Sequence, residues 1–157
     1  DESVTTGREF FAQTAGSRPH TWLNNCGGSI GFGMPLAIGA AVASPDQKVI
    51  ALEGDGSAMY TVQSLWTMAR ENLDITVLIF ANQSYKILQG ELTNVGVVNP
   101  GKSALEMLSL KKPSLDWVSI SRGMGVDAVR VDNIDDLVKS FKYGLKENGP
   151  YLIEIMI

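Results

Sequence analysis

The sequence has few of the features that mark secreted, membrane and nucleic-acid-binding proteins. Cys26 is the only cysteine, so the chain can form neither an intrachain disulfide nor a pair of cysteine metal ligands. No apolar run reaches the roughly 18 residues of a membrane span, and the first residues lack both the basic and the apolar region of a signal peptide. Lys and Arg total 13 against 17 Asp and Glu, without a basic block. We therefore expect a cytoplasmic protein that binds neither nucleic acid nor a membrane.

The dinucleotide-binding pattern G-x-G-x-x-G is also absent. It would require a glycine at position 59 after Gly54 and Gly56, and that position is Met59. This disfavours an ordinary nicotinamide dehydrogenase domain, which would bind NADH without a metal ion. The formal net charge is -4, so a phosphate ligand would need a metal ion and backbone N–H groups to supply positive charge locally.

Two apolar runs predict the centre of the fold. Lys48 to Leu52 and Ile75 to Phe80 lack polar alternation, as expected for parallel strands that are covered on both faces. Between them, apolar residues from Val62 to Ala69 recur at helical spacing, which completes a β-α-β unit. The remaining pattern predicts helices over Thr6–Ala15, Pro35–Ala43, Ser84–Leu92, Asp116–Gly123 and Asp135–Lys146, strands over Thr21–Asn24, Ala128–Val131 and Tyr151–Ile157, and an irregular segment from Gly96 to Pro113.

These elements predict a single α/β domain over residues 1–157. The expected architecture has three layers, with a doubly wound, mainly parallel sheet covered by helices on both faces. Trp66 and Trp117 lie at helical spacing and are expected in the core, and Cys26 is expected to be small and buried. The single histidine, His20, is expected at the surface.

Polar residues follow both central strands. Gly54-Asp55-Gly56-Ser57 ends the first run and Asn82 ends the second, so a carboxylate and an amide oxygen should reach the same edge of the sheet. Mg²⁺ prefers such oxygen ligands together with substrate phosphates, and the Ser84 carbonyl is a third candidate ligand. The glycines allow close approach of backbone N–H groups to a diphosphate, to which Ser57 can donate its hydroxyl.

A simpler interpretation of Asp55 remains open. A lone Gly-Asp-Gly is equally typical of a turn in which the aspartate caps a helix. The presence of Asn82 at the next strand end favours the magnesium-diphosphate site.

Beyond these residues, the chain resembles a known superfamily. The Gly-Asp-Gly-Ser sequence and the later Ala81-Asn82, together with Tyr60, Leu65-Trp66-Thr67 and Tyr85, are similar to the thiamine diphosphate motif of pyruvate decarboxylase, benzoylformate decarboxylase and acetolactate synthase. Residues Gly28 to Pro35 resemble the loop and helix that precede this motif, so the likeness covers nearly the whole chain. One position departs from the pattern, because Ala81 stands where the family usually has a first asparagine that is not the metal ligand.

The resemblance implies a cofactor and a set of residues for it. Thiamine diphosphate would be bound with Mg²⁺, and Ile30 would be the apolar support beneath its two rings. The implied metal ligands are Asp55, Asn82 and Ser84. The implied cofactor-binding residues are Thr5, Gly28, Ile30, Gly54, Asp55, Gly56, Ser57, Asn82, Tyr85, Ile87 and Leu88.

The resemblance also implies an activity that this chain would not complete alone. The family decarboxylates 2-oxo acids or joins them to a second carbonyl compound, and its catalytic glutamate lies in a pyrimidine-binding domain of the same or another subunit. No glutamate of this chain matches that motif, so we assign no catalytic residue here. A homodimer or homotetramer is expected for the full-length protein. The alternative is a non-catalytic α/β binding or assembly module that retains the motif as a relic, for which Ala81 is the only hint.

Overall fold

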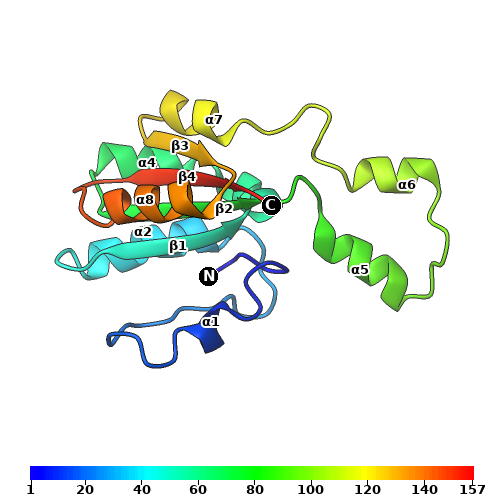
Figure 1. The fold of residues 1–157 in the computed structure, drawn as a ribbon, viewed down its shortest axis with the longest axis horizontal. Helices are drawn as coiled ribbons and strands as arrows, with labels where there is room; N and C mark the ends of the chain where they lie inside the picture. The colour runs from blue at the N-terminus through cyan, green and yellow to red at the C-terminus, as the bar shows by residue number, and fades with distance from the viewer.

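The computed structural model describes all 157 residues. Its centre is a parallel sheet of four strands in the order β1-β2-β4-β3 (Figure 1). Each strand is rich in β-branched and other apolar residues, which favours a sheet buried on both faces. The strands are β1 (Val49–Gly54), β2 (Ile75–Ala81), β3 (Asp127–Val131) and β4 (Tyr151–Met156).

Helices cover both faces of this sheet. One face packs against α2 (Gly33–Ala43), α4 (Ser64–Arg70) and α7 (Trp117–Gly123). The other packs against α8 (Ile134–Gly144). The connection from β3 to β4 runs backwards along the sheet, and a right-handed crossover in that direction places its helix on the opposite face. The predicted three-layer, doubly wound α/β fold is confirmed.

Two groups of short elements lie outside these layers. Near β1 are α1 (Phe10–Gln13), α3 (Asp55–Ala58) and the 3-10 helix η1 (Met59–Thr61). The other group, α5 (Lys86–Asn94) and α6 (Lys102–Met107), projects away from the sheet (Figure 1). We call residues 86–113 the arm, and none of them is buried.

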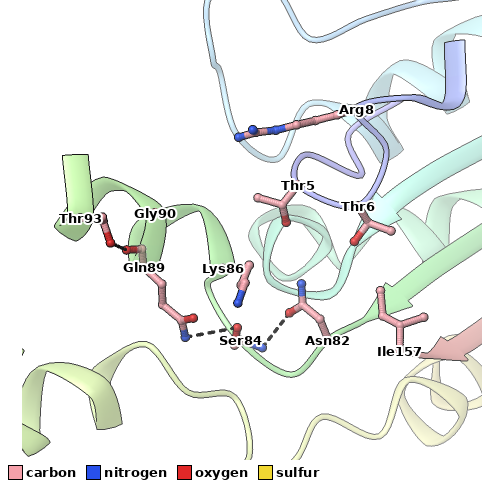
Figure 2. A pocket seen from close by; sticks show the side chains of 10 residues that line it. All are labelled: Thr5, Thr6, Arg8, Asn82, Ser84, Lys86, Gln89, Gly90, Thr93 and Ile157. Atoms are coloured by element: carbon pink, nitrogen blue, oxygen red, sulfur yellow. Dashed lines mark hydrogen bonds between the residues drawn. The ribbon is translucent and has the colours of Figure 1, made fainter. Parts of the chain in front are cut away.

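The carboxyl ends of the parallel strands lie on one side of the sheet. Asn82 follows β2 and Ile157 follows β4, and both line one cavity together with residues of the N-terminal segment and α5 (Figure 2). This is the edge at which open α/β sheets bind ligands.

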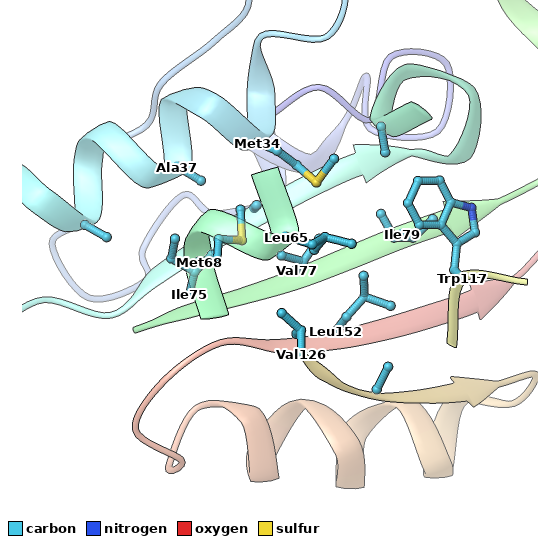
Figure 3. Close-up of a cluster of buried hydrophobic side chains, with 14 residues drawn as sticks. Met34, Ala37, Leu65, Met68, Ile75, Val77, Ile79, Trp117, Val126 and Leu152 are labelled. Atoms are coloured by element: carbon cyan, nitrogen blue, oxygen red, sulfur yellow. The ribbon is translucent and has the colours of Figure 1, made fainter. Parts of the chain in front are cut away.

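The core consists of two clusters separated by the sheet. The larger contains 14 buried residues, among them Met34 of α2, Met68 of α4 and Trp117 of α7 (Figure 3). The smaller contains four buried strand residues that pack against Leu137 and Phe141 of α8. Burial of large apolar side chains on both faces holds the strand ends in a fixed arrangement.

Most of the predicted elements are confirmed, and four expectations are wrong. The first helix is only the single turn α1, and Thr21–Asn24 forms no strand and pairs with none of the four strands of the sheet. Trp66 is 53% exposed and packs on Arg70, whereas Trp117 is buried as expected. Cys26 is exposed in a glycine-rich turn. None of the helices combines the length and the hydropathy that a membrane span requires.

Candidate functional site

Asp55 joins the ends of the two central strands. β1 ends at Gly54, and Asp55 begins α3 with only 3% of its surface exposed. One carboxylate oxygen accepts a hydrogen bond from the Gly56 N–H at 3.0 Å, and the other accepts one from the Gln83 N–H at 2.7 Å. The predicted juxtaposition of the two strand ends is therefore present, through a contact between Asp55 and the residue after Asn82.

The environment of Asp55 disfavours an unpaired charge. Burial raises the pKa of the Asp55 carboxyl above its usual value, while the hydrogen bonds from Gln83 and Gly56 act in the opposite direction. A buried carboxylate is stabilised in its charged form by a cation placed beside it. A cation beside Asp55 would therefore offset the cost of burying its charge.

The turn after β2 presents further oxygen atoms. The Asn82 side-chain oxygen accepts a hydrogen bond from the Ser84 N–H at 2.9 Å, and the Ser84 carbonyl accepts no backbone hydrogen bond. Gln83 lies in the left-handed region with φ +54°, which is strained for a residue with a side chain. Backbone hydrogen bonds of 2.9 Å to Leu108 and Leu110 of the arm hold the turn from outside.

Gly56 lies directly beneath an aromatic ring. A Cβ atom at this position would come within 2.8 and 2.9 Å of two ring carbons of Tyr85. Such distances are shorter than van der Waals contact, so any side chain at position 56 would displace Tyr85. This close approach brings the turn after β1 and the start of the arm together.

Cationic side chains are among those that line the cavity beside these turns. It has a volume of ≈ 780 Å³ and is lined by Thr5, Thr6, Arg8, Asn82, Ser84, Lys86, Gln89, Gly90, Thr93 and Ile157. The lining side chains include two cations and no Asp or Glu, although the chain as a whole carries a net charge of -4. Figure 2 shows Thr5 and Thr6 facing the turn of Asn82 and Ser84, with α5 closing one side.

A second polar cluster lies behind the glycine-rich loop. Glu2 is buried, and its two carboxylate oxygens accept hydrogen bonds from the N–H groups of Gly31 at 2.6 Å and Gly33 at 2.7 Å. Glu53 is also buried and lies against Gly33, where a Cβ atom would come within 2.1 Å of one of its oxygens. Burial first, and then the neighbouring Glu2 carboxylate, raises the pKa of Glu53 to about 8.

The structure gathers part of the predicted set around the cavity. Thr5, Asn82 and Ser84 line it, whereas Asp55, Gly56 and Ser57 lie buried in the adjoining turn. The remaining predicted residues do not line the cavity. Gly28 and Ile30 lie in the exposed glycine-rich loop, Gly54 ends β1, Tyr85 covers Gly56, and Ile87 and Leu88 begin α5.

Sequence reasoning missed several cavity residues. Lys86, Gln89 and Thr93 lie at the spacing of one helix face, which was the available signal for them. Arg8 and Thr6 had no such signal, because their position depends on how the N-terminal segment crosses the end of the sheet. The cluster of Glu2 and Glu53 depends on the same crossing.

One phosphate-binding pattern lies in the wrong structural context. Residues 96–103 read G-x-x-x-x-G-K-S, the sequence of a phosphate P-loop. They follow the helix α5 instead of a strand, lead into the six-residue α6, and are nearly all exposed. The pattern therefore does not form the strand-loop-helix arrangement that a P-loop requires.

The donors at the strand ends fit one kind of metal ion. The chain has no group of three or more His, Cys, Asp or Glu side chains arranged to hold a metal ion. One carboxylate, one amide oxygen and one backbone carbonyl are a partial oxygen set. Mg²⁺ is commonly bound by such a set, with phosphate oxygens and water in its other positions.

Comparison with known proteins decides the family. Residues 6–155 match the model described as "Thiamine pyrophosphate enzyme, C-terminal TPP binding domain", and TPP is another name for thiamine diphosphate. The chain belongs to this family. Across its whole length, the chain is 47% identical to a Mycobacterium tuberculosis protein named as a candidate acetolactate synthase large subunit, IlvX. Over 98% of its length it is 32% identical to benzoylformate decarboxylase of Pseudomonas aeruginosa.

A solved structure gives the same result for the fold. The chain superposes on a thiamine diphosphate-dependent 4-hydroxybenzoylformate decarboxylase of Rhodococcus jostii with a TM-score of 0.71 and 35% identity. The match covers 80% of this chain and 22% of that chain. Against the two curated relatives above, the chain spans 31% and 28% of their lengths. The predicted family is confirmed.

Proposed function

We propose that this chain holds thiamine diphosphate through a Mg²⁺ ion at the carboxyl ends of β1 and β2. In this proposal, the whole protein is a 2-oxo acid decarboxylase or an acetolactate synthase-like carboligase. The observation that supports it best is the hydrogen bond of 2.7 Å between the Gln83 N–H and the Asp55 carboxylate. This bond fixes the carboxylate beside the turn that carries the Asn82 amide oxygen and the Ser84 carbonyl.

The charge around the cavity supports an anionic ligand. The charged side chains that line it, Arg8 and Lys86, are both cations. A diphosphate bound to Mg²⁺ retains negative charge, and the two side chains would complement it or the carboxylate of a 2-oxo acid substrate. Thr5 would donate its hydroxyl to the phosphate oxygens from the side opposite α5.

In this proposal, each further residue keeps the role that the resemblance implies. Ser57 would donate its hydroxyl to the diphosphate, and Gly54 and Gly56 on either side of Asp55 would let the backbone come close to it. Ile30 is 46% exposed in the glycine-rich loop and would support the cofactor rings by apolar contact, with Gly28 beside it. On the other side of the cofactor from Ile30, contacts would come from Tyr85 before α5 and from Ile87 and Leu88 in its first turn.

The cofactor, when bound, supplies the electron sink for breaking the bond next to the substrate carbonyl. The residues of this chain would bind it, orient it and exclude water from it. We assign no proton transfer to them, because no Asp or Glu side chain lines the cavity. The glutamate that acts on the cofactor would come from a pyrimidine-binding domain of the same or another subunit.

The arm supports docking of such a domain. It has no buried residue and exposes a set of large apolar side chains: Leu88, Val95, Val97, Val98, Leu105 and Met107. Exposed apolar surface of this kind marks contact sites with other proteins or domains. The relatives are about three times as long as this chain, so they contain further domains that such a surface would contact.

Calorimetric titration of the full-length protein tests the proposed function. Thiamine diphosphate should bind with Mg²⁺ present and lose most of its affinity after chelation of the metal, whereas NADH should not bind. Release of CO₂ from 2-oxo acids by the loaded protein would separate an enzyme from a non-catalytic module. Metal-independent binding, or no binding at all, would contradict the proposed site.

A further inference from the structure

The Glu2 side chain links two parts of the proposed site that are distant in sequence. Its oxygens accept hydrogen bonds from the N–H groups of Gly31 and Gly33, at 2.6 and 2.7 Å, across 29 and 31 residues of chain. Both contacts are charge-assisted, which makes them shorter and stronger than bonds between neutral groups. Glu2 is only 2% exposed and does not line the cavity, so solvent does not compete for these bonds.

The Glu2 backbone is fixed to the end of β1. Its N–H donates to the Leu52 carbonyl at 2.7 Å, and its carbonyl accepts from the Gly54 N–H at 3.2 Å. These are the bonds of a short parallel bridge to Glu53. One residue therefore connects the glycine-rich loop to the residue that directly precedes Asp55.

The loop is also confined from its other side. The Gly31 carbonyl accepts a hydrogen bond of 2.8 Å from the Thr61 hydroxyl of η1. Gly31 has φ +85°, and a Cβ atom there would come within 2.6 Å of the Tyr60 Cβ. The loop thus has little room to shift, and the side chain that it presents next to this confined glycine is that of Ile30, which is 46% exposed.

We propose that Glu2 is a positioning residue, which sets the distance between Ile30 and the Asp55 turn so that one ligand can contact both. The inference rests on the proposed function, in which Ile30 supports the cofactor rings and the Asp55 turn holds the diphosphate. Thr61 assists from the opposite side of the loop. Glu2 itself touches neither the cofactor nor the substrate.

Two probes separate this role from a general contribution to stability. Inorganic pyrophosphate with Mg²⁺ needs only the Asp55 turn, whereas thiamine diphosphate with Mg²⁺ also needs the loop. In Glu2→Gln the side chain keeps its size but has one acceptor oxygen, and its NH₂ group must face one of the two N–H donors. In the full-length protein, this change should lower the affinity for thiamine diphosphate about tenfold and leave the affinity for pyrophosphate unchanged.

Two further variants complete the experiment. Glu9→Gln removes an exposed carboxylate from the same N-terminal segment and should change neither affinity. Thr61→Val removes the second support of the loop without loss of volume, and should weaken thiamine diphosphate binding alone, by less than Glu2→Gln does. Hydrogen exchange of a peptide over residues 28–34 should be faster in both loop variants, while peptides from β2 remain protected.

Three results would overturn the inference. Wild-type affinity for thiamine diphosphate in Glu2→Gln would show that the loop needs no anchor. An equal loss of pyrophosphate binding would show that Glu2 merely supports the Asp55 turn or the fold. If Glu2→Gln does not fold, unchanged cofactor affinity in Thr61→Val would contradict the role of the loop. A wild-type protein that binds neither probe would instead refute the proposed function, and this inference with it.

Discussion

Gly33→Ala tests the packing behind the glycine-rich loop. Gly33 is the first residue of α2, and a Cβ atom there would come within 2.1 Å of a Glu53 oxygen and 2.9 Å of the Glu2 Cβ. Neither side chain can swing into solvent, because Glu53 is 1% and Glu2 is 2% exposed. The new methyl group must therefore displace a buried carboxylate or shift the start of α2.

The size of the effect follows from these contacts. Overpacking of a buried site costs about 1–3 kcal/mol. A shift of the Gly33 N–H away from Glu2 adds the loss of a charge-assisted hydrogen bond, about 1.5–3 kcal/mol. Replacement of a helical glycine by alanine returns at most about 1 kcal/mol. We expect the free energy of unfolding of this domain to fall by about 2–5 kcal/mol.

Gly39→Ala is the matched control. Gly39 lies in the same helix, and a Cβ atom there has nothing within 4 Å. This change should stabilise the domain by up to about 1 kcal/mol. Native-state hydrogen exchange of peptides from β1 and β2 measures the stability of this domain within the full-length protein. Equal protection in the two variants would refute the argument that Glu2, Glu53 and Gly33 are tightly packed.

Three further predictions concern stability. Met68→Ala leaves a cavity at a fully buried position and should lower the free energy of unfolding by about 2–5 kcal/mol. Trp66→Ala removes a largely exposed side chain and should lower it much less. Exchange protection of the β2 amides compares the two variants. Asn133 accepts a hydrogen bond from the Asp136 N–H at the start of α8, and Asn133→Ala should cost about 1 kcal/mol, visible as faster exchange in α8. The pKa of Glu53 is raised from 4.5 to about 8, so this group binds a proton in the folded but not the unfolded chain at pH values between these limits. The stability that protonated Glu53 contributes should be fully present below pH 4.5 and should be lost, by on the order of a few kcal/mol, as the pH rises through about 8. A pH dependence of the exchange rates that is just as steep in Glu53→Gln would contradict this.

Local sequence patterns predicted the three layers of the fold because each strand or helix depends mainly on the residues within it. The apolar runs of β1 and β2 and the helical spacing of α8 require only that one side of each element be buried. The same patterns failed where burial or strand pairing depended on residues far away in the sequence. Trp66 has the spacing of a core residue but lies on the outer side of α4, and Thr21–Asn24 has strand-forming residues but pairs with no strand of the sheet.

The candidate site shows the same division. Asp55 and Asn82 could be placed together from sequence, because parallel strands end at one edge of the sheet. The contact of Asp55 with the Gln83 N–H accompanies a left-handed backbone conformation at Gln83. No residue type in that turn predicts this conformation. The anchoring of the glycine-rich loop by Glu2 joins segments about 30 residues apart, and only the folded chain reveals it.

The most direct test of the magnesium-diphosphate site is the affinity of Asp55→Asn for thiamine diphosphate in the presence of Mg²⁺. The change removes the buried negative charge at the end of β1 and should lower the affinity of the full-length protein about 10- to 100-fold. The control is Asp46→Asn, an exposed aspartate in the turn before β1, which should bind like the wild type. Wild-type affinity in Asp55→Asn, with the exchange protection of β1 intact, would contradict the account.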